Sequence, residues 1–248
     1  MVFTTWSSPR WLPMKPGAIK TNHSFTPAKV PIMKTLLGAL LTLVTALPVI
    51  AQSDLNHWNF ATAKIAADGR LVATGTAGRN FSSTDSAITL VDDAEAPGGK
   101  AISFSGVQMK SPSVGPVYER PGPLQVKFSV KPAADSSQNE QTILVHPGVY
   151  ELRYSKSRGD ITAYFPQKDS KQIVSVRAPL PASQWTAVEL SVKGAEAKLT
   201  VAGETTSMTF PEGTALQSSK SFVRLGMMVQ GRPFKGLLSD LTIADPTE

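Results

Sequence analysis

The chain has 248 residues, and most of its formal net charge of +6 comes from the first part of the sequence. Five basic residues and no acidic residue precede Asp54, which leaves 20 Lys and Arg against 19 Asp and Glu from there onward. A nearly neutral remainder lacks the electrostatic footprint of a nucleic-acid-binding protein. The sequence has no cysteine, which excludes disulfides, a thiol nucleophile and a lipid-modified cysteine.

Residues 33 to 51 have the features of a secretory signal peptide. Met33-Lys34-Thr35 is a short positive start, and an apolar run follows from Leu36 to Leu47. Val49 and Ala51 are small residues at the positions that precede a cleavage site. The run is shorter than the roughly 20 apolar residues of a spanning helix, although an uncleaved anchor is the alternative. We expect cleavage after Ala51, no transmembrane segment afterwards, and a periplasmic, cell-surface or extracellular location.

Residues 1 to 32 fit this signal less well, because five prolines break any periodic pattern and a signal normally begins close to its methionine. We interpret Met33 as the true start and residues 1 to 32 as a non-native upstream extension or disordered leader. The alternative is a long basic segment that is translated and then removed with the signal. Both interpretations leave residues 52 to 248 as a single domain of roughly 195 residues, large enough for a substantial core.

Beyond Asp54 the sequence shows many short alternating runs and no helical stripe. In the clearest run, Leu124, Val126, Phe128 and Val130 alternate with polar residues, as in a half-buried strand. Turn residues separate such runs at intervals of roughly ten residues, which predicts an all-β fold, a two-sheet antiparallel β-sandwich. Strands are expected at residues 101–104, 124–131, 141–145, 149–155, 161–165, 172–177, 187–192, 197–201, 221–226 and 237–243, and loops at residues 111–123 and 131–140.

The order of these pieces is similar to that in a known superfamily. The segments concerned are Trp58-Asn59-Phe60, 99–106, 130–132, 141–144, 184–188, 201–203, 225–226 and 234–243. Their succession resembles the laminin-G-like, concanavalin A-like lectin and glucanase superfamily, whose domains are jelly rolls of two packed antiparallel sheets. The resemblance covers about Leu55 to Pro246.

The resemblance implies that the first strand pairs beside the last, which would bring Trp58 and Phe60 close to residues 237–243. Trp58 and Phe60 alternate with a polar residue, as expected of a strand with one buried face. Gly226 and Gly236 suit places where backbones approach closely. We expect Trp185, at the entrance to a strand, to anchor the core, with a sugar platform as the alternative.

A glycan-cleaving enzyme of this fold would need two carboxylates opposed across the scissile bond. In the glucanase branch they follow the pattern Glu-x-Asp-x-x-Glu along one strand, and no such run occurs here. The closest acidic group is Asp92-Asp93 with Glu95, which lies beside Pro97-Gly98-Gly99. Adjacent strand residues face opposite ways, so we interpret this group as a solvated turn.

A polysaccharide lyase on the same architecture would combine a Tyr or His base with an Arg that neutralises a uronate carboxylate. His146 and Tyr154 lie close in sequence to Glu151, Arg153 and Tyr164. Strand alternation puts Glu151 and Arg153 on one face, which Tyr164 can share, so these three are our candidate ligand-binding residues. The alternative is a solvent-facing Glu and Arg beside a half-buried Tyr. No lyase motif is recognisable, and we predict no catalytic residue.

Metal binding has weak support in the sequence. The two histidines beyond residue 53 lack ligand-spaced partners, which argues against zinc. Asp240 falls in a strand whose Leu237, Leu241 and Ile243 look like core residues. We predict no cofactor, although the superfamily often binds calcium through loop carboxylates, and the resemblance leaves calcium open at Asp85, Asp92, Asp93 and Asp240.

The sequence therefore predicts an exported, non-catalytic binding module of the concanavalin A-like lectin type. It would engage a glycan or an exported or envelope protein through one sheet face or its rim loops. One alternative is a polysaccharide-active enzyme, a lyase or glycoside hydrolase, with Glu151, Arg153 and Tyr164 as its site. The other is a purely structural envelope protein.

Overall fold

The computed structural model describes residues 56–107, 113–117, 123–167, 173–212, 214, 216–227 and 231–244. The predicted upstream extension and signal peptide lie outside these residues. The described residues belong to one compact unit, which begins at Pro48. They include no helix that is both long enough and apolar enough to cross a membrane.

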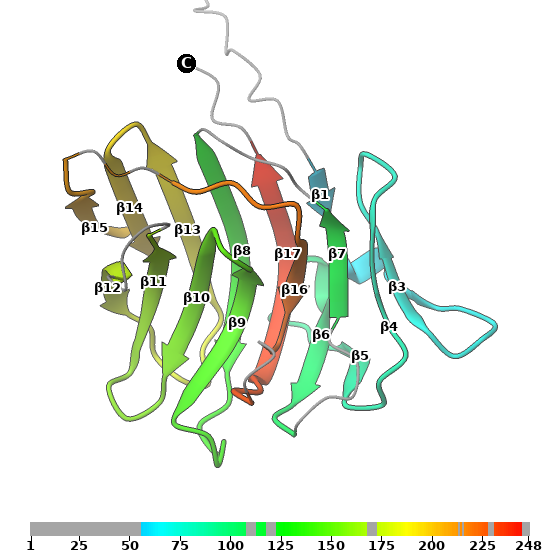
Figure 1. Cartoon of the computed structure of the whole chain (residues 1–248). Helices are drawn as coiled ribbons and strands as arrows, with labels where there is room; N and C mark the ends of the chain where they lie inside the picture. Colours follow the sequence, from blue (N-terminus) through cyan, green and yellow to red (C-terminus); the bar gives the residue numbers. More distant parts are fainter. Residues whose placement is uncertain are drawn as a thin grey trace, which may run out of the picture. The chain divides into compact units, whose positions relative to one another are not determined.

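Two antiparallel sheets face each other in this unit (Figure 1). Sheet A contains, in spatial order, β15 (Glu204–Thr209), β14 (Glu196–Val201), β13 (Thr186–Lys193), β8 (Leu124–Pro132), β17 (Lys235–Ala244), β6 (Lys100–Ser105) and β5 (Ile88–Asp92), with β1 (Asn56–Trp58) paired to β17. Sheet B contains β12 (Ile173–Pro179), β11 (Asp160–Pro166), β10 (Tyr150–Ser155), β9 (Glu140–His146), β16 (Phe222–Leu225), β7 (Ser113–Val117), β4 (Asn80–Ser83), β3 (Leu71–Thr74) and β2 (Lys64–Ile65). The short 3-10 helices η1 (Phe60–Thr62) and η2 (Pro97–Gly99) lie in connections.

This arrangement confirms the predicted all-β, two-sheet antiparallel sandwich, and it fits a jelly roll. The core lies between the sheets because each strand turns its apolar residues inward. On β8, Leu124, Val126, Phe128 and Val130 are all buried, as the alternation predicts. Aromatic rings fill both ends of the core, with ring centroids 4.7 Å apart for Trp58–Phe81 and 5.2 Å for Phe165–Phe210.

The first and last strands pair, as the resemblance implies. Trp58 lies opposite Leu241, and the Trp58 indole Nε1 donates a hydrogen bond of 2.8 Å to the Arg79 carbonyl. The prediction that Phe60 continues this strand is wrong, although Phe60 is fully buried. The Asn59 side chain accepts a hydrogen bond from the Ala61 amide and caps η1, which turns the chain away from the strand.

The residues of β17 that face the core differ from the prediction because the strand contains a bulge. The pairing of β17 with β8 shifts between Ser239 and Leu241, and Asp240 adopts a left-handed φ of 48°. Because of the extra residue, the side chains that precede the bulge point to the opposite side of the sheet from the one predicted. Leu238 is therefore the buried residue and Leu237 is only partly buried, whereas Leu241 is buried as predicted.

Gly236 lies where two backbones approach closely, as predicted. A Cβ atom at this position would stand 2.6 Å from the Lys131 carbonyl oxygen and 2.6 Å from the Phe234 ring. Gly226 has a φ of 77°, and its amide donates to the Ile143 carbonyl at 2.8 Å. Only glycine fits the close approach at Gly236.

The prediction of a continuous loop at residues 111–123 is wrong, because β7 forms within it. Proline-rich sequence is typical of loops, but Pro116 lies where the pairing of β7 with β16 is irregular, and such a place tolerates a strand proline. β7 pairs with β4 through only one residue pair, Ser82 and Val114. The short strands β2 to β5 and β15 were also not predicted.

Candidate functional site

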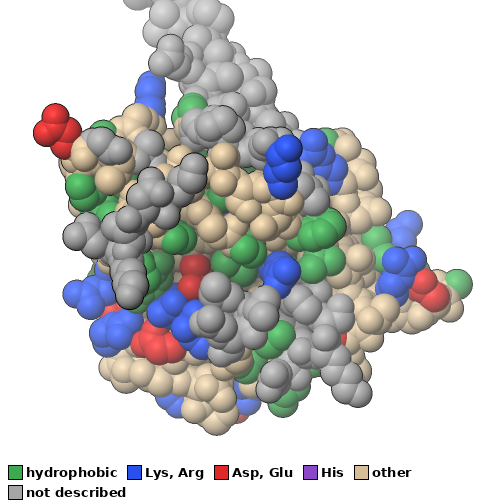
Figure 2. All heavy atoms as spheres, viewed as in Figure 1, with side chains coloured by type: hydrophobic (Ala, Val, Ile, Leu, Met, Phe, Trp, Pro, Cys, Tyr) green, Lys and Arg blue, Asp and Glu red, His purple; other side chains and the backbone are tan. Residues whose placement is uncertain are grey.

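The outer surface of sheet B collects the polar residues of β9, β10, β11 and β12 in cross-strand rows. We call this surface, with the adjoining Arg224 of β16 and Arg232 of the β16–β17 connection, the sheet B face. Its central row contains Arg177, Thr162, Arg153 and Thr142, and the next contains Ser175, Tyr164, Glu151, Val145 and Arg224. Figure 2 shows basic and acidic side chains gathered together over this part of the molecule.

Glu151 is the centre of the sheet B face and is 7% exposed. Its carboxylate accepts a hydrogen bond of 2.6 Å from the Thr142 hydroxyl and a bidentate pair from Arg153, with Nη2 at 2.8 Å and Nε at 3.3 Å. Arg232 Nη2 lies 3.3 Å from Oε1 and 3.4 Å from Oε2. The Thr142 amide also donates to the Arg232 carbonyl at 3.0 Å. One carboxylate therefore ties β9, β10 and the β16–β17 connection together.

Arg153 is held from two sides. The carbon at the centre of its guanidinium group lies 4.3 Å from the centroid of the Tyr164 ring, a cation–π arrangement. Tyr164 stands directly opposite Glu151 across β10 and β11. Within the described residues, the structure gives neither Arg153 Nη1 nor the Tyr164 hydroxyl a hydrogen-bond partner. The Arg153–Tyr164 stack thus presents an oriented donor and an aromatic ring.

The charges of this centre are stabilised by their surroundings. Burial alone would raise the pKa of Glu151, but hydrogen bonds from Arg153 and Thr142 and the charge of Arg232 outweigh burial and lower it below its ordinary value. The pKa of Arg153 is raised because Glu151 outweighs the effect of burial. Glu151 is therefore ionised at neutral pH, which suits a positioning role better than that of a general acid.

A second group of charges lies at the end of the same strands. Arg158 Nε lies 3.0 Å and Arg177 Nε 3.7 Å from Asp160 Oδ2, and Arg158 Nη1 lies 3.1 Å from Glu140 Oε1. Asp160 stands opposite Ser155, whose own pairing partner on β9 is Glu140. Each of the three carboxylates that the described residues place on the sheet B face is thus paired with arginine.

The sequence placed Glu151, Arg153 and Tyr164 on one face, and the structure brings them into contact. The other residues considered for a lyase site lie elsewhere. His146 pairs with the inward-facing Tyr150 and lies edge-on to its ring, with the ring centroids 6.0 Å apart. Tyr154 is buried in the core. The alternative of a solvent-facing Glu and Arg is wrong for Glu151. Sequence reasoning missed Thr142, which the alternation of its strand could have indicated, and Arg232, which only the tertiary fold brings near.

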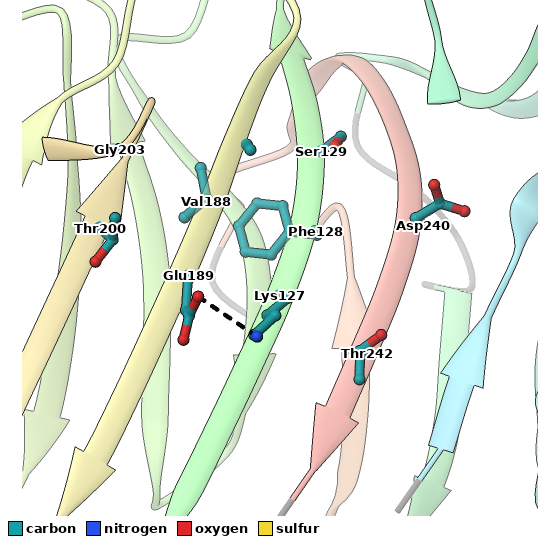
Figure 3. A pocket seen from close by; sticks show the side chains of 10 residues that line it. Lys127, Phe128, Ser129, Val188, Glu189, Thr200, Gly203, Asp240 and Thr242 are labelled. Carbon is teal, nitrogen blue, oxygen red and sulfur yellow. Dashed lines mark ion pairs between the residues drawn. The ribbon is translucent and has the colours of Figure 1, made fainter. Parts of the chain in front are cut away.

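Sheet A carries another candidate, a pocket of about 230 Å³ on its outer surface (Figure 3). Small side chains such as Ser129 and Ala187 leave this hollow between the strands. Lys127 and Glu189 form an ion pair of 3.6 Å at its border, and Asp240 lies on the β17 side. No buried polar atom of its lining residues lacks a hydrogen-bond partner. The pocket therefore offers less recognition chemistry than the sheet B face.

Trp185 is not the core anchor that the sequence predicts. It is only partly buried, and its Nε1 donates a hydrogen bond of 3.2 Å to Asp93 Oδ2. Lys131 Nζ lies 3.5 Å from the same oxygen and 2.8 Å from Glu95 Oε2. The turn predicted around Asp93 is present, but the Asp93 side chain is only 15% exposed because the connection folds back toward Trp185. Trp185 thus lies at the surface beside charged residues.

The candidate calcium ligands serve separate local contacts. Asp85 accepts from the Ala87 amide at 2.9 Å, Asp92 lies 3.7 Å from Lys100 Nζ, and Asp240 lies 4.0 Å from His57 Nε2. Burial raises the pKa of Asp240, and the charge of His57 opposes this. Across the part of the chain that the structure describes, no three His, Asp or Glu residues form a group that could hold a metal ion.

Comparison with known proteins identifies the fold but no family. No protein-family model matches the chain, and a search of curated proteins found no match. Similar solved structures include the receptor-binding domain of botulinum neurotoxin mosaic serotype C/D, with 14% identity and a TM-score of 0.51 over 79% of this chain and 48% of that one. The binding domain of Paraclostridial Mosquitocidal Protein 1 has 10% identity and a TM-score of 0.55 over 79% of this chain and 49% of that one.

A further similar structure matches the present domain over most of its length. Domain 4 of AbnA, a GH43 extracellular arabinanase from Geobacillus stearothermophilus, in complex with arabinotriose, has 19% identity and a TM-score of 0.54. The match covers 77% of this chain and 91% of that one. The chain spans about half the length of the toxin binding domains. At these identities the likeness shows a shared β-sandwich fold.

Proposed function

We propose that this chain is an exported, non-catalytic binding module that engages a glycan through the sheet B face. The observation that carries the proposal is the Arg153–Tyr164 stack, which the buried Glu151 anchors from below. An aromatic ring beside an oriented guanidinium suits a sugar, because the part of the ring that Arg153 leaves uncovered can pack against apolar C–H groups of the sugar while the arginine donates to its oxygens. Arg153 Nη1 and the Tyr164 hydroxyl, which have no hydrogen-bond partner among the described residues, are the donors that we propose for the ligand.

Similar structures add support of a weaker kind. The arabinanase domain was solved with an oligosaccharide, and the toxin domains are described as binding domains. Binding without catalysis is favoured because the carboxylates of the sheet B face are engaged by arginines, and the lowered pKa of Glu151 disfavours proton donation. An exported or envelope protein as the ligand, and a purely structural role, are the alternatives that binding measurements would reveal.

The experiment is a glycan array followed by calorimetric titration of the purified protein. Tyr164→Ala should weaken glycan binding about tenfold, which corresponds to about 1.4 kcal/mol. The variant removes both the ring that would contact the sugar and the stack that orients Arg153. Lys198→Ala, on the outer surface of sheet A, is the matched control and should bind normally. Binding that is indifferent to Tyr164, or release of reducing ends from a polysaccharide, would contradict the proposal.

Export is proposed from the sequence of residues 33 to 51 and is tested separately. Mass spectrometry of exported protein should find Gln52 at the mature N-terminus. Peptides from residues 1 to 32 in the exported material would show that the signal has been misassigned.

A further inference from the structure

We infer that the glycan bound by the sheet B face is anionic, and that Arg177 and Arg153 hold its carboxylate or sulfate group above Thr162. This inference rests on the proposed function, because it names the ligand class of the same face.

The first argument is the geometry of the central row. Arg177 lies directly opposite Thr162, and Thr162 lies directly opposite Arg153, on three neighbouring strands. With strands about 4.8 Å apart, the Cα atoms of the two arginines are about 10 Å apart. In the structure the two guanidiniums flank Thr162, because Arg153 contacts Glu151 and Tyr164 on one side of it and Arg177 contacts Asp160 on the other. The Arg177 side chain is 60% exposed, so it can swing toward Arg153 and close on an anionic group above the threonine.

The second argument is the Thr162 hydroxyl itself. Thr162 is 4% exposed, and its Oγ1 has no hydrogen-bond partner in the described residues. The Ser155 hydroxyl, two residues along β10 from Arg153, is in the same state. Buried hydroxyls are nearly always paired, because leaving one unpaired destabilises the fold. The hydroxyl is covered in this structure, so a ligand oxygen that supplies the acceptor Thr162 lacks has to displace a neighbouring side chain.

The third argument is the balance of charge. Five arginines belong to the sheet B face or pair with it, at positions 153, 158, 177, 224 and 232, against the three carboxylates Glu140, Glu151 and Asp160. Among the residues that the structure describes, the face therefore has two more positive than negative groups. Arg224 has no ion-pair partner among the described residues, and its Nε is buried without one. An anion would compensate this excess.

A neutral sugar fits these residues less well. Recognition of sugar hydroxyls needs acceptors as well as donors, and guanidinium groups only donate. The three carboxylates are already occupied by arginines. Arg177 is the most available donor, since its side chain is 60% exposed and only a 3.7 Å contact joins it to Asp160. Its planar fork matches a carboxylate or sulfate group.

The test uses matched pairs of polymers titrated into the full chain. Polygalacturonate is compared with its carboxyl-reduced form, and dextran sulfate with dextran. We expect the charged member of at least one pair to bind about tenfold or more tightly, and its affinity to fall as salt screens the charges. Arg177→Ala should lower that affinity about fivefold or more, whereas Lys198→Ala, which removes the same charge from the other sheet, should not.

Thr162→Val separates a binding role from a structural one. The substitution keeps the side-chain shape and removes the hydroxyl. We expect weaker binding of the charged polymer, because the hydroxyl that would contact it is gone. The melting temperature should be unchanged or raised, because an unpaired buried hydroxyl has been removed. A structural role would instead lower the melting temperature and leave the affinity of the folded protein unchanged.

The outcomes separate this inference from the proposed function. Arg177-dependent binding of the uronate or the sulfated polymer supports the inference and identifies the anionic group. Equal binding within each pair, with dependence on Tyr164, overturns the inference and leaves the proposed function intact. Binding of no polymer overturns the inference, and the glycan array then decides the proposed function. Competition by inorganic sulfate, without binding of either charged polymer, would show an ion site and overturn the glycan assignment.

Discussion

Glu151 is the residue on which the sheet B face depends. A buried carboxylate is unfavourable unless donors surround it, and here Thr142, Arg153 and Arg232 all donate to it. Removing one donor leaves the charge buried and less well compensated. Arg153→Ala should therefore lower the free energy of unfolding by about 1.5 to 3 kcal/mol, the range for hydrogen bonds to charged groups. Chemical denaturation measures this loss, and a change of less than about 0.5 kcal/mol, typical of surface sites, would contradict it.

The pH dependence of stability provides a second test of Glu151. Its pKa in the folded protein lies below the ordinary value of 4.5, so its contribution to stability is fully present above about pH 4.5. That contribution is lost as the pH falls through the lower folded pKa, because protonation breaks the contacts with the arginines. Glu151→Gln should be less stable than the wild type at pH 7 and should lose less stability on acidification. If the free energies of unfolding of the two proteins changed in parallel from pH 7 to pH 3, Glu151 would make no such contribution.

Phe128 and Trp185 illustrate the difference between a buried and a surface aromatic residue. Phe128 is 4% exposed, so Phe128→Ala should destabilise the fold by about 3 to 5 kcal/mol. Trp185→Phe removes only the hydrogen bond to Asp93, for which we expect about 0.5 to 1.5 kcal/mol. Thermal or chemical denaturation of both variants measures the difference. Similar losses at the two positions would mean that Trp185 belongs to the core after all.

Among the elements, β17 does most to join the halves of sheet A, since it pairs with β8, β6 and β1. Its bulge at Asp240 sets which leucine faces inward. Deleting Asp240 would remove the extra residue and turn Leu237, not Leu238, toward the core. We expect loss of cooperative unfolding or insoluble protein. Asp240→Gly keeps the bulge and relieves the left-handed conformation, so it should fold normally, and circular dichroism and thermal melting distinguish the two.

The elements also show where sequence patterns suffice. The alternation in β8 and in the β10–β11 hairpin was long enough to predict facing, and so Glu151, Arg153 and Tyr164 could be placed on one surface. The pattern in β17 failed because one inserted residue reverses the facing, and Leu237 looks as apolar as Leu238. Trp185 failed for a different reason, because a large aromatic residue is usually buried. Its partner Asp93 comes from a connection 92 residues earlier in the chain.

At the scale of the whole domain, the two outer surfaces differ in their chemistry. Sheet A presents a pocket bordered by one satisfied ion pair, Lys127–Glu189. Within the described part of the chain, sheet B presents more arginines than carboxylates, together with buried hydroxyls that lack hydrogen-bond partners. A sandwich with one such surface can bind a ligand without rearranging its core, because the core residues and the outer residues alternate along the same strands. The binding variants proposed for this face should therefore leave the fold intact.

The pairing of β1 with β17 makes the start of the domain essential to its stability. A chain that begins at Gln52 keeps β1, whereas one that begins at Phe60 loses Trp58, which is fully buried and hydrogen-bonded to the Arg79 carbonyl. Loss of that indole alone should lower stability by about 3 to 5 kcal/mol. The Asn56 side chain, which accepts from the Ala77 amide at 2.7 Å, is lost with it.

We expect residues 52–248 to melt cooperatively at the temperature of the full chain, and residues 60–248 to melt far lower or to aggregate. Trp58→Phe in the longer form is the matched control. It keeps a ring in the core but removes the indole hydrogen bond and part of the buried ring, so its loss should be smaller than the roughly 3 to 5 kcal/mol of full truncation. If residues 60–248 were as stable as residues 52–248, β1 would not be an integral strand of sheet A. Closure of the sandwich would then rest on β17 and its pairing with β6 and β8 alone.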